Sequence, residues 1–269
     1  MLFKYLPSER VDVLENLKIR FSPLKSLNDP FEAQPLIDLS VERDQQAKVI
    51  ANKLESLWEN TAEHERTEEN RAWLEKEKEQ LLLNLNEMTN PFNLGQELMT
   101  LLSDNLGVLS LSRTCENLLM WSHYAQEGKG FVIGFDDKHD FFNQPDLLGN
   151  RTNPIPVIYT NKRSHIVLRE KSYYEKLLCE KPRNWAYEEE ERVFRTFFDK
   201  SASAGFDPLG MSIILTGIPK EVIKCIYLGY NVSNELEGEI LSAIAANKIS
   251  CCILRAKVST TEYKVEFYS

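Results

Sequence analysis

The sequence predicts an α+β fold in which helices flank a mostly antiparallel, split sheet. Short segments with alternating apolar and polar residues recur along the chain, as expected for half-buried strands. Most of these segments are joined by turns too short for the crossovers that parallel strands need. One long segment, 41–90, has instead the composition of helices. We therefore expect a single α+β domain over residues 1–269, with a helical hairpin inserted within it.

Composition and charge limit the classes of function. The 269 residues are 42% hydrophobic and 10% aromatic, which is enough for a substantial core. The net charge of −9 disfavours a protein that coats nucleic acid, since phosphate contacts need Lys and Arg. No window is apolar for the length of a membrane span, and the first residues do not resemble a signal peptide. We expect a cytoplasmic protein that has no membrane partner.

The cysteines and histidines show no metal-binding pattern. None of the five cysteines forms a Cys-x-x-Cys pair, and the four histidines lack ligand spacing, so we predict no metal site. Without a signal peptide, we expect all five cysteines to be reduced thiols. They are Cys115, Cys179, Cys225, Cys251 and Cys252.

The N-terminal segment predicts two strands and a turn. Residues 2–5 and 17–21 alternate as strands do, and residues 8–15 between them read as a short helix. Asn28-Asp29-Pro30 follows and is a turn signal, because Asn and Asp bond their own backbone while Pro fixes φ. The turn either presents these side chains to a ligand or only reverses the chain.

The stretch 41–88 is predicted to be two helices. It lacks Gly and Pro, and it holds twelve acidic and seven basic residues, so it carries five of the nine net negative charges. Apolar residues recur at helical spacing on either side of a polar break at 61–70. The hairpin is a lid, a surface for a partner protein or a second subunit, or simple packing against the body. A further helix is expected over 94–105.

A strand, a helix and a strand are expected in the middle of the chain, over 107–112, 117–125 and 131–135. Asn117 is a plausible N-cap of the helix. The helix carries four polar-capable side chains in succession, which is unusual for a plain amphipathic helix. It is either the wall of a pocket or a core helix whose polar groups are satisfied internally. The four residues are Trp121, Ser122, His123 and Tyr124.

The last part of the chain holds a run of glutamates and several regular elements. In a segment that leads into a strand near Arg192, Glu188 and Glu190 would point one way, and the two intervening glutamates the other. An edge strand is expected over 154–160, where prolines occur. The remaining expectations are strands over 211–215 and 225–229, a helix over 233–246 and a hairpin of 252–258 with 263–267.

Four pieces of the chain together resemble the bacterial DUF2971 family of unknown function. The insertion lies outside them, and the family name implies no mechanism. The pieces are Phe3-Lys-Tyr5; Phe21-Ser-Pro with Asn28-Asp-Pro-Phe-Glu32; Ser110-Leu-Ser112 with Met120-Trp-Ser-His-Tyr-Ala125 and Gly130; and Lys181 with Trp185-x-Tyr187-Glu188-x-Glu190-x-Arg192.

The layout is also similar, more loosely, to the ADP-ribosyltransferase fold, whose split antiparallel sheet pinches NAD. In that fold an early strand offers Arg or His, a middle strand Ser or Tyr, and a late strand a catalytic Glu. Lys4, then Ser110 and Ser112, and then Glu190 fall in that order, with Lys where the enzymes usually have Arg or His. The resemblance implies an NAD-dependent ADP-ribosyl transfer or NAD cleavage enzyme, and by analogy a toxin or phage-defence effector. The acceptor would be a protein, a nucleic acid or water.

The chemistry of such an enzyme assigns roles to these residues. Breaking the nicotinamide–ribose bond develops oxocarbenium character at the sugar, which a nearby carboxylate stabilises. We expect Glu190 to supply it with Glu188 beside it, and His123 to bond a ribose hydroxyl. Arg192, two residues past Glu190 and on the same strand face, is expected to orient Glu190 by an ion pair. The expected NAD-binding residues are Lys4, Tyr5, Asn28, Asp29, Ser112, Trp121, Ser122, Tyr124, Trp185 and Arg192.

Two other classes of function fit the same residues. In a non-catalytic binding or regulatory module, the glutamates, Asn28, Asp29 and the aromatic helix would form a buried polar network that fixes the fold. In a metal-dependent nuclease, Glu188, Glu190 and Asp29 would surround a divalent ion.

Overall fold

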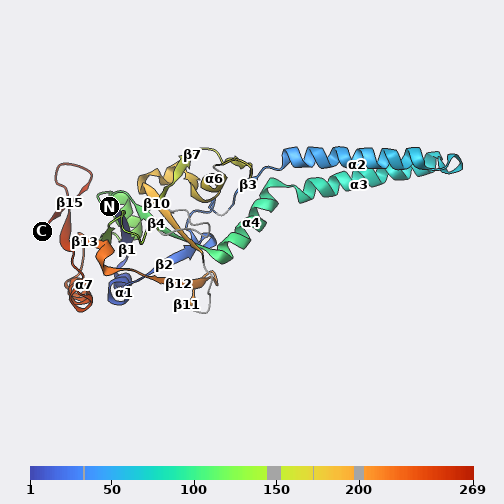
Figure 1. The fold of residues 1–269 in the computed structure, drawn as a ribbon. Coiled ribbons are helices and arrows are strands. Elements are labelled where there is room, and N and C mark those ends of the chain that lie inside the picture. The colour runs from blue at the N-terminus through green and yellow to red at the C-terminus, as the bar shows by residue number, and fades with distance from the viewer. Residues whose placement is uncertain (33, 144–152, 172, 197–202) are drawn as a thin grey trace. The chain divides into compact units, whose positions relative to one another are not determined.

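The computed structural model describes the chain except for residues 33, 144–152, 172 and 197–202 (Figure 1). Packing divides the chain into two compact units, and each is described by itself. Unit 1 comprises Met1–Glu32, Leu102–Lys162 and Cys179–Ser269. Unit 2 comprises Ala33–Leu101 and Arg163–Leu178, so it includes the expected insertion together with a second, later segment.

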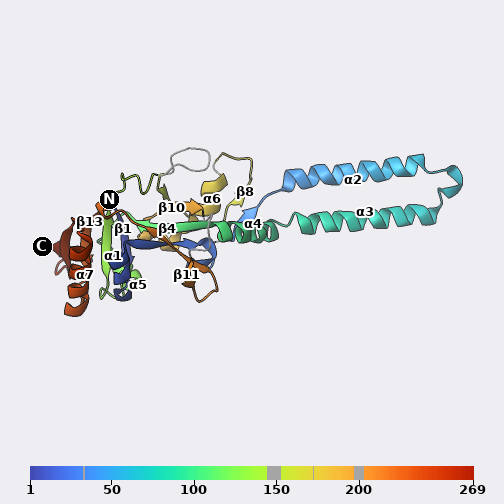
Figure 2. The same cartoon turned by 60° about the horizontal axis from the view of Figure 1, so that its bottom comes forward.

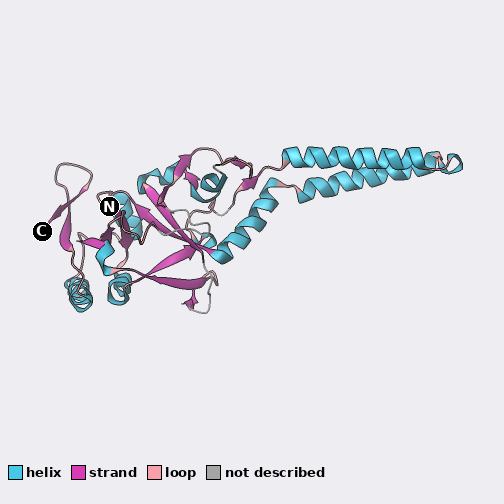
Figure 3. Ribbon diagram, viewed as in Figure 1, coloured by secondary structure: helices cyan, strands magenta, loops and turns pink. Residues whose placement is uncertain are grey.

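Unit 1 is built on one large sheet, whose strands are magenta in Figure 3. Among the described residues, eleven strands join it in the order β11-β12-β2-β4-β1-β5-β13-β14-β15, with β10 beside β4 and β6 beside β10. Within the described part of this sheet, only β13 and β14 pair in parallel, so the expected α+β fold with a mostly antiparallel sheet is confirmed. The strands are β1 (Leu2–Leu6), β2 (Lys18–Pro23), β4 (Leu106–Ser112), β5 (Phe131–Phe135), β6 (Ile155–Pro156), β10 (Glu190–Thr196), β11 (Ser203–Phe206), β12 (Ser212–Gly217), β13 (Ile223–Leu228), β14 (Cys252–Val258) and β15 (Val265–Tyr268).

Strand β4 is where the sheet divides. Along one edge, β4 pairs with β10 over its whole length, and Glu190 stands opposite Ser112. Along the other edge, β4 pairs first with β2, through Val108, and then with β1, through Ser112. Between these two contacts, the carbonyl of Ser110 accepts a hydrogen bond from Lys4 Nζ at 2.9 Å. A lysine side chain therefore fills the place where the backbone ladder is interrupted.

Helices and a small second sheet complete unit 1. The predicted N-cap is confirmed, since the Asn117 side chain accepts from the backbone N–H groups of Leu119 and Met120. The stretch expected as one edge strand, 154–160, is two strands, because β6 pairs with β10 whereas β7 pairs in parallel with β9. The other elements are α1 (Asp12–Asn16), α5 (Leu118–Tyr124), α7 (Asn234–Asn247), β7 (Ile158–Thr160), β9 (Glu180–Pro182) and the 3-10 turns η1 (Ser8–Val11), η2 (Leu24–Ser26), η4 (Arg183–Glu188) and η5 (Lys220–Val222).

The sheet buries side chains on both faces. Alternation along β1 sends Leu2 and Leu6 into one apolar cluster, and Phe3 and Tyr5 into another. The second cluster also contains the fully buried ring of Trp121, which meets Tyr5 edge to face. Helix α5 therefore packs on the face of β1 that bears Phe3 and Tyr5.

Unit 2 contains the predicted helical hairpin. Helices α2 (Ser40–Asn60) and α3 (Glu68–Met88) lie side by side and are joined through η3 (Glu63–Glu65) (Figure 2). No residue of α2 and only Leu74 of α3 is buried. The unit also includes most of α4 (Pro91–Asn105), β3 (Leu36–Ile37) paired with β8 (His165–Ile166), and most of α6 (Tyr173–Cys179). Throughout the described residues, no helix is long and apolar enough to cross a membrane.

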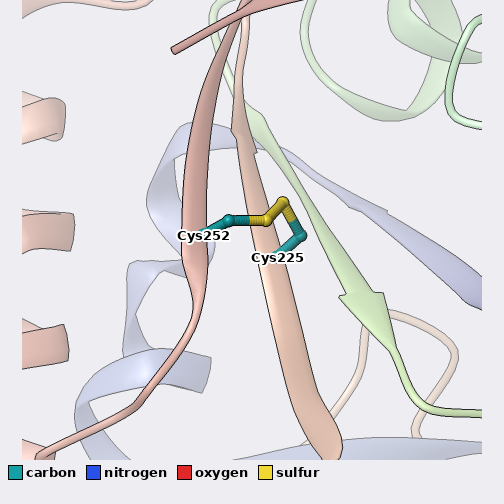
Figure 4. Close-up of a disulfide and its surroundings, with 2 residues drawn as sticks. All are labelled: Cys225 and Cys252. Carbon is teal, nitrogen blue, oxygen red and sulfur yellow. A yellow bond between two sulfur atoms is a disulfide. The ribbon is translucent and has the colours of Figure 1, made fainter.

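The expectation that all five cysteines are reduced is wrong. Cys225 and Cys252 stand opposite each other on the parallel strands β13 and β14, and they form a disulfide (Figure 4). Their Cα atoms are 4.5 Å apart, because neighbouring strands carry register partners at that spacing. The pairing depends on strand register, which cysteine spacing in the sequence does not reveal. Cys115, Cys179 and Cys251 are free thiols.

Candidate functional site

A cleft opens in unit 1 where β1, β4 and β10 meet helix α5. The space between its walls is about 460 Å³, open solvent at its mouth included. Apolar side chains, among them Phe3, Leu27 and Met120, form part of its wall. Polar groups converge on it from segments far apart in the sequence. They are Lys4, Tyr5, Asn28, Glu32, Ser110, Ser112, Tyr124, Lys181, Glu188 and Glu190.

Lys181, on β9, pairs with all three carboxylates of the cleft. Its Nζ lies 2.6 Å from Glu188 Oε2, 3.2 Å from Glu190 Oε2 and 4.0 Å from Glu32 Oε1. The side chains of all four residues are no more than 5% exposed. Three carboxylates therefore share one buried ammonium group, and burial without such a partner would be very costly.

Arg192 holds two of these carboxylates from the side. Its Nε lies 2.9 Å from Glu190 Oε1, and its Nη2 lies 3.1 Å from Glu190 Oε2. This is the two-point contact that suits a guanidinium and a carboxylate. The same Nη2 also donates to Glu32 Oε1. The expected ion pair between Arg192 and Glu190, which lie on one face of β10, is confirmed.

Burial and charge shift the protonation equilibria of this cluster in different directions. Burial raises the pKa of Glu190, although Lys181 and the Ser110 hydroxyl oppose the shift. Burial alone would lower the pKa of Lys181, but Glu190 and Glu188 together raise it above its ordinary value. Burial also lowers the pKa of Arg192 to about 10, so both cations stay charged at neutral pH.

Lys4 differs from the other two cations because none of its hydrogen bonds goes to a carboxylate among the described contacts. Its Nζ donates to the Ser110 carbonyl. Burial lowers the pKa of Lys4 to about 8, with a weaker opposing effect from Glu190. A fraction of this amine is therefore neutral near pH 8, which weakens it as a site for phosphate.

Helix α5 presents one of its faces to the cleft. Met120 and Tyr124, four residues apart, line the cleft, as helical periodicity requires. The Tyr124 hydroxyl donates to Glu188 Oε1 and accepts from Asn28 Nδ2 at 2.8 Å. Burial and the bond to Glu188 raise the pKa of Tyr124, so its hydroxyl remains a donor. The turn at Asn28, the helix and the glutamate are thus linked by hydrogen bonds.

Several predicted site residues lie elsewhere. Trp121 is fully buried, and its Nε1 donates to the Cys115 carbonyl at 2.8 Å, so its indole does not line the cleft. Ser122 is half-buried and His123 is exposed, because the intervening positions of α5 turn away from the cleft. Neither lines the cleft, and His123 Nδ1 shares a hydrogen bond with Tyr187 at 2.9 Å.

The other predicted residues that do not line the cleft lie behind or beside the charged cluster, which consists of Lys181, Arg192, Glu32, Glu188 and Glu190. Trp185 does not line the cleft, and its ring centre lies 4.8 Å from Lys181 Nζ, where it packs on the ammonium group. Asp29 is buried and closes the turn by accepting from the Phe31 backbone N–H at 2.9 Å. Arg192 meets the cleft only through the glutamates that it holds.

Ser110, expected beside Ser112 on the middle strand, faces the cleft one alternation before it. The sequence assigned no role to three other residues of the site. Lys181 and Glu32 both stand in the segments that carry the family resemblance, which is the signal that could have found them. Tyr159, whose hydroxyl accepts from the Glu190 backbone N–H at 2.8 Å, had no signal in the sequence.

The described acidic side chains of the cleft are paired with cations and are not grouped as metal ligands. Within the described part of the chain, no group of three or more His, Cys, Asp and Glu side chains is placed to hold a metal ion. Glu188 and Glu190, two of the proposed ligands, already accept hydrogen bonds from Lys181.

Comparison with known proteins confirms the family resemblance. Residues 120–193 match the family described as "Protein of unknown function (DUF2971)", and this match covers most of α5 as well as Lys181, Glu188, Glu190 and Arg192. No curated protein and no solved structure gave a significant match to the chain. The matched segment thus contains most of the charged cluster.

Proposed function

We propose that this cleft binds NAD and that the protein cleaves its nicotinamide–ribose bond, with ADP-ribosyl transfer to an acceptor. One observation carries the proposal. Lys4, Ser112 and Glu190 lie on three neighbouring strands, β1, β4 and β10, and all three line one cleft. The resemblance to the ADP-ribosyltransferase fold implies such a trio, drawn from an early, a middle and a late strand.

The proposed reaction breaks one bond and forms one. The bond between ribose C1′ and the nicotinamide nitrogen breaks, and its electron pair neutralises the pyridinium. The resulting charge at C1′ is stabilised by the Glu190 carboxylate. A hydroxyl of water or of an acceptor molecule then bonds to C1′, and Glu188 accepts its proton.

The surrounding cations fit a positioning role. Arg192 and Lys181 hold Glu190 at both oxygens, so its carboxylate keeps one orientation. Tyr124 donates to one oxygen of Glu188 and Lys181 to the other. A preorganised carboxylate needs no reorientation as charge develops on the sugar, which is the main advantage of such sites.

The test is titration of NAD into the purified protein, with nicotinamide release followed in the same samples. We expect binding, and a fall in release of about 100-fold or more in Glu190→Gln, because the neutral amide cannot stabilise the developing charge. Glu191→Gln is the matched control, since Glu191 is the adjacent glutamate and pairs with Arg113 instead. A folded protein that neither binds NAD nor releases nicotinamide would refute the proposal.

A second candidate function, a non-catalytic binding module, is favoured because both glutamates already have their hydrogen-bond partners within the protein. Every oxygen of Glu188 and Glu190 has a partner within the protein, as in a network that fixes a fold. The same titration separates the two readings. Binding of NAD without release of nicotinamide, unchanged in Glu190→Gln, would support the module.

A further inference from the structure

We propose that Glu32 selects the substrate at this cleft by accepting a hydrogen bond from an amide N–H, the carboxamide of the nicotinamide ring. This inference rests on the proposed function and assigns Glu32 as its specificity-determining residue. The proposed reaction uses Glu190 and Glu188 and assigns no step to Glu32, yet Glu32 lines the cleft.

The observation is an incomplete set of hydrogen bonds. Glu32 Oε1 accepts from Arg192 Nη2, while Glu32 Oε2 is buried and has no hydrogen-bond partner among the described residues. The Glu32 side chain is only 3% exposed. A buried acceptor without a donor is destabilising, so the protein keeps Glu32 here at a cost that a donor on the ligand would remove.

The chemistry of the cleft decides which donor fits. The proposed reaction places ribose C1′ at Glu190 and the attacking hydroxyl at Glu188, which leaves the carboxamide of the ring as the amide donor on the reacting half of NAD. One N–H of the carboxamide can donate a hydrogen bond to the free oxygen of Glu32. A ligand with a carboxylate in place of the carboxamide would instead bring a second negative charge against Glu32.

The charges around the cleft balance, because Lys4, Lys181 and Arg192 lie beside its three carboxylates. The oxygen of Glu32 that has no donor is therefore the local feature that opposes a carboxylate on the ligand. The cleft suits a ligand end that donates through an amide, and it disfavours the acid analogue of the same ring.

Discrimination of this kind is strong when a buried group is left unpaired by the wrong ligand. A site that hydrogen-bonds a substrate N–H or O–H rejects analogues that lack it far more than a missing methylene would allow. Repulsion adds to this effect when the analogue brings a carboxylate. Exchange of Glu32 for Gln should remove the repulsion, because the amide of Gln offers both a donor and an acceptor.

The experiment compares three dinucleotides on the intact 269-residue chain: NAD, nicotinic acid adenine dinucleotide and 3-acetylpyridine adenine dinucleotide. All three keep the ribose hydroxyls, and the last two lack the amide donor. We expect the wild type to bind both analogues at least roughly 100-fold more weakly than NAD. In Glu32→Gln, the preference for NAD over the acid analogue should fall below about tenfold. Thermal melting of this variant reports whether it folds.

The outcomes separate the two proposals. If NAD is bound and cleaved with dependence on Glu190, but the wild type binds all three dinucleotides alike, the role of Glu32 is refuted while the function stands. If discrimination is strong but persists in folded Glu32→Gln, the role of Glu32 is again refuted. If none of the dinucleotides binds, both proposals fail. The wild-type series needs no variant, so a Glu32→Gln protein that does not fold still leaves the inference open to refutation.

Discussion

At the scale of single residues, Lys4 is the most unusual group in the cleft. It occupies the gap where β4 changes partners, and it donates to a backbone carbonyl rather than to one of the three nearby carboxylates. Lys181 and Arg192 already pair with those carboxylates. Lys4 is thus a charged group in a buried place without a close counter-ion, which is why its pKa falls to about 8.

This lowered pKa predicts a pH-dependent cost in stability. Between pH 8 and 10.5, Lys4 is neutral in the folded protein but still protonated when unfolded, so the unfolded state binds more protons and stability rises with pH. Below pH 8 the cost is present in full. Lys4→Met has no such group, so the difference in unfolding free energy should shift in favour of the wild type by about 1–3 kcal/mol between pH 7 and pH 10.

Urea denaturation of both proteins at the two pH values measures this shift. Other titrating groups are common to the two proteins and cancel in the difference. The upper figure assumes a fully buried amine, and the side chain of Lys4 retains some exposure, so values toward 1 kcal/mol are expected. A difference that does not vary with pH would show that Lys4 is charged in the folded protein throughout this range.

The part of the site that was predictable from the sequence follows from local periodicity. Alternation along one strand placed Glu190 and Arg192 on a common face, and their ion pair forms as expected. Local periodicity does not say which face of a helix meets a cleft, so Trp121 was placed there together with Tyr124. Lys181 and Glu32 reach the same point through tertiary packing, which no local pattern encodes.

At the scale of elements, the strands of the large sheet were easier to predict than their pairing. The hairpin of β14 and β15 forms as expected, because a short polar segment after residue 258 separates two alternating segments and favours a local turn. The neighbours of β13 are β5 and β14, and the helix α7 makes the crossover between β13 and β14 that a parallel pair needs. This non-local pairing brings Cys225 to Cys252.

Because of the disulfide, the protein should have fewer free thiols than the five cysteines of its sequence. Alkylation of the unfolded protein without reductant should label three of its five cysteines, and all five after reduction. Closing a loop between residues 27 apart restricts the unfolded chain, so the double change Cys225→Ser and Cys252→Ser should cost about 3 kcal/mol of stability.

Mass spectrometry of the alkylated protein gives the count, and urea denaturation gives the stability. Cys251→Ser is the matched control, because Cys251 adjoins the disulfide in sequence and is itself a free thiol. This variant should label two cysteines without reductant and lose less than about 0.5 kcal/mol. Five labelled cysteines in the unreduced wild type would contradict the pairing.

At the scale of the whole molecule, the cleft and the helical hairpin belong to different units. Every residue that lines the cleft lies in unit 1, although these residues come from all three of its chain segments. The composition of 41–88 was sufficient to predict the hairpin, since charge and helical spacing are local properties. The return of residues 163–178 to unit 2 was not predictable, because it depends on the pairing of β8 with β3.

The hairpin buries too little of its surface to be required for the fold of unit 1. Helix α2 has no buried residue, and Leu74 is the only one in α3. The paired helices are held mainly by exposed contacts, such as that of Arg71 with Glu55 and with the Trp58 ring. Exposed ion pairs of this kind contribute little to stability. Removal of the hairpin should therefore leave the unfolding of unit 1 almost unchanged.

The corresponding experiment replaces residues 41–88 with about twelve Gly and Ser residues, whose root-mean-square reach of roughly 20 Å allows the two ends to reconnect. We expect a cooperative melting transition within about 3 °C of the wild type, because little apolar surface is lost from the rest of the chain. Leu74→Asp is the matched control: it puts a charge at the one buried position of α3 while keeping the chain length. A deletion variant that no longer melts cooperatively, beside a Leu74→Asp protein that does, would show that the hairpin supports the fold of unit 1 as an intact element.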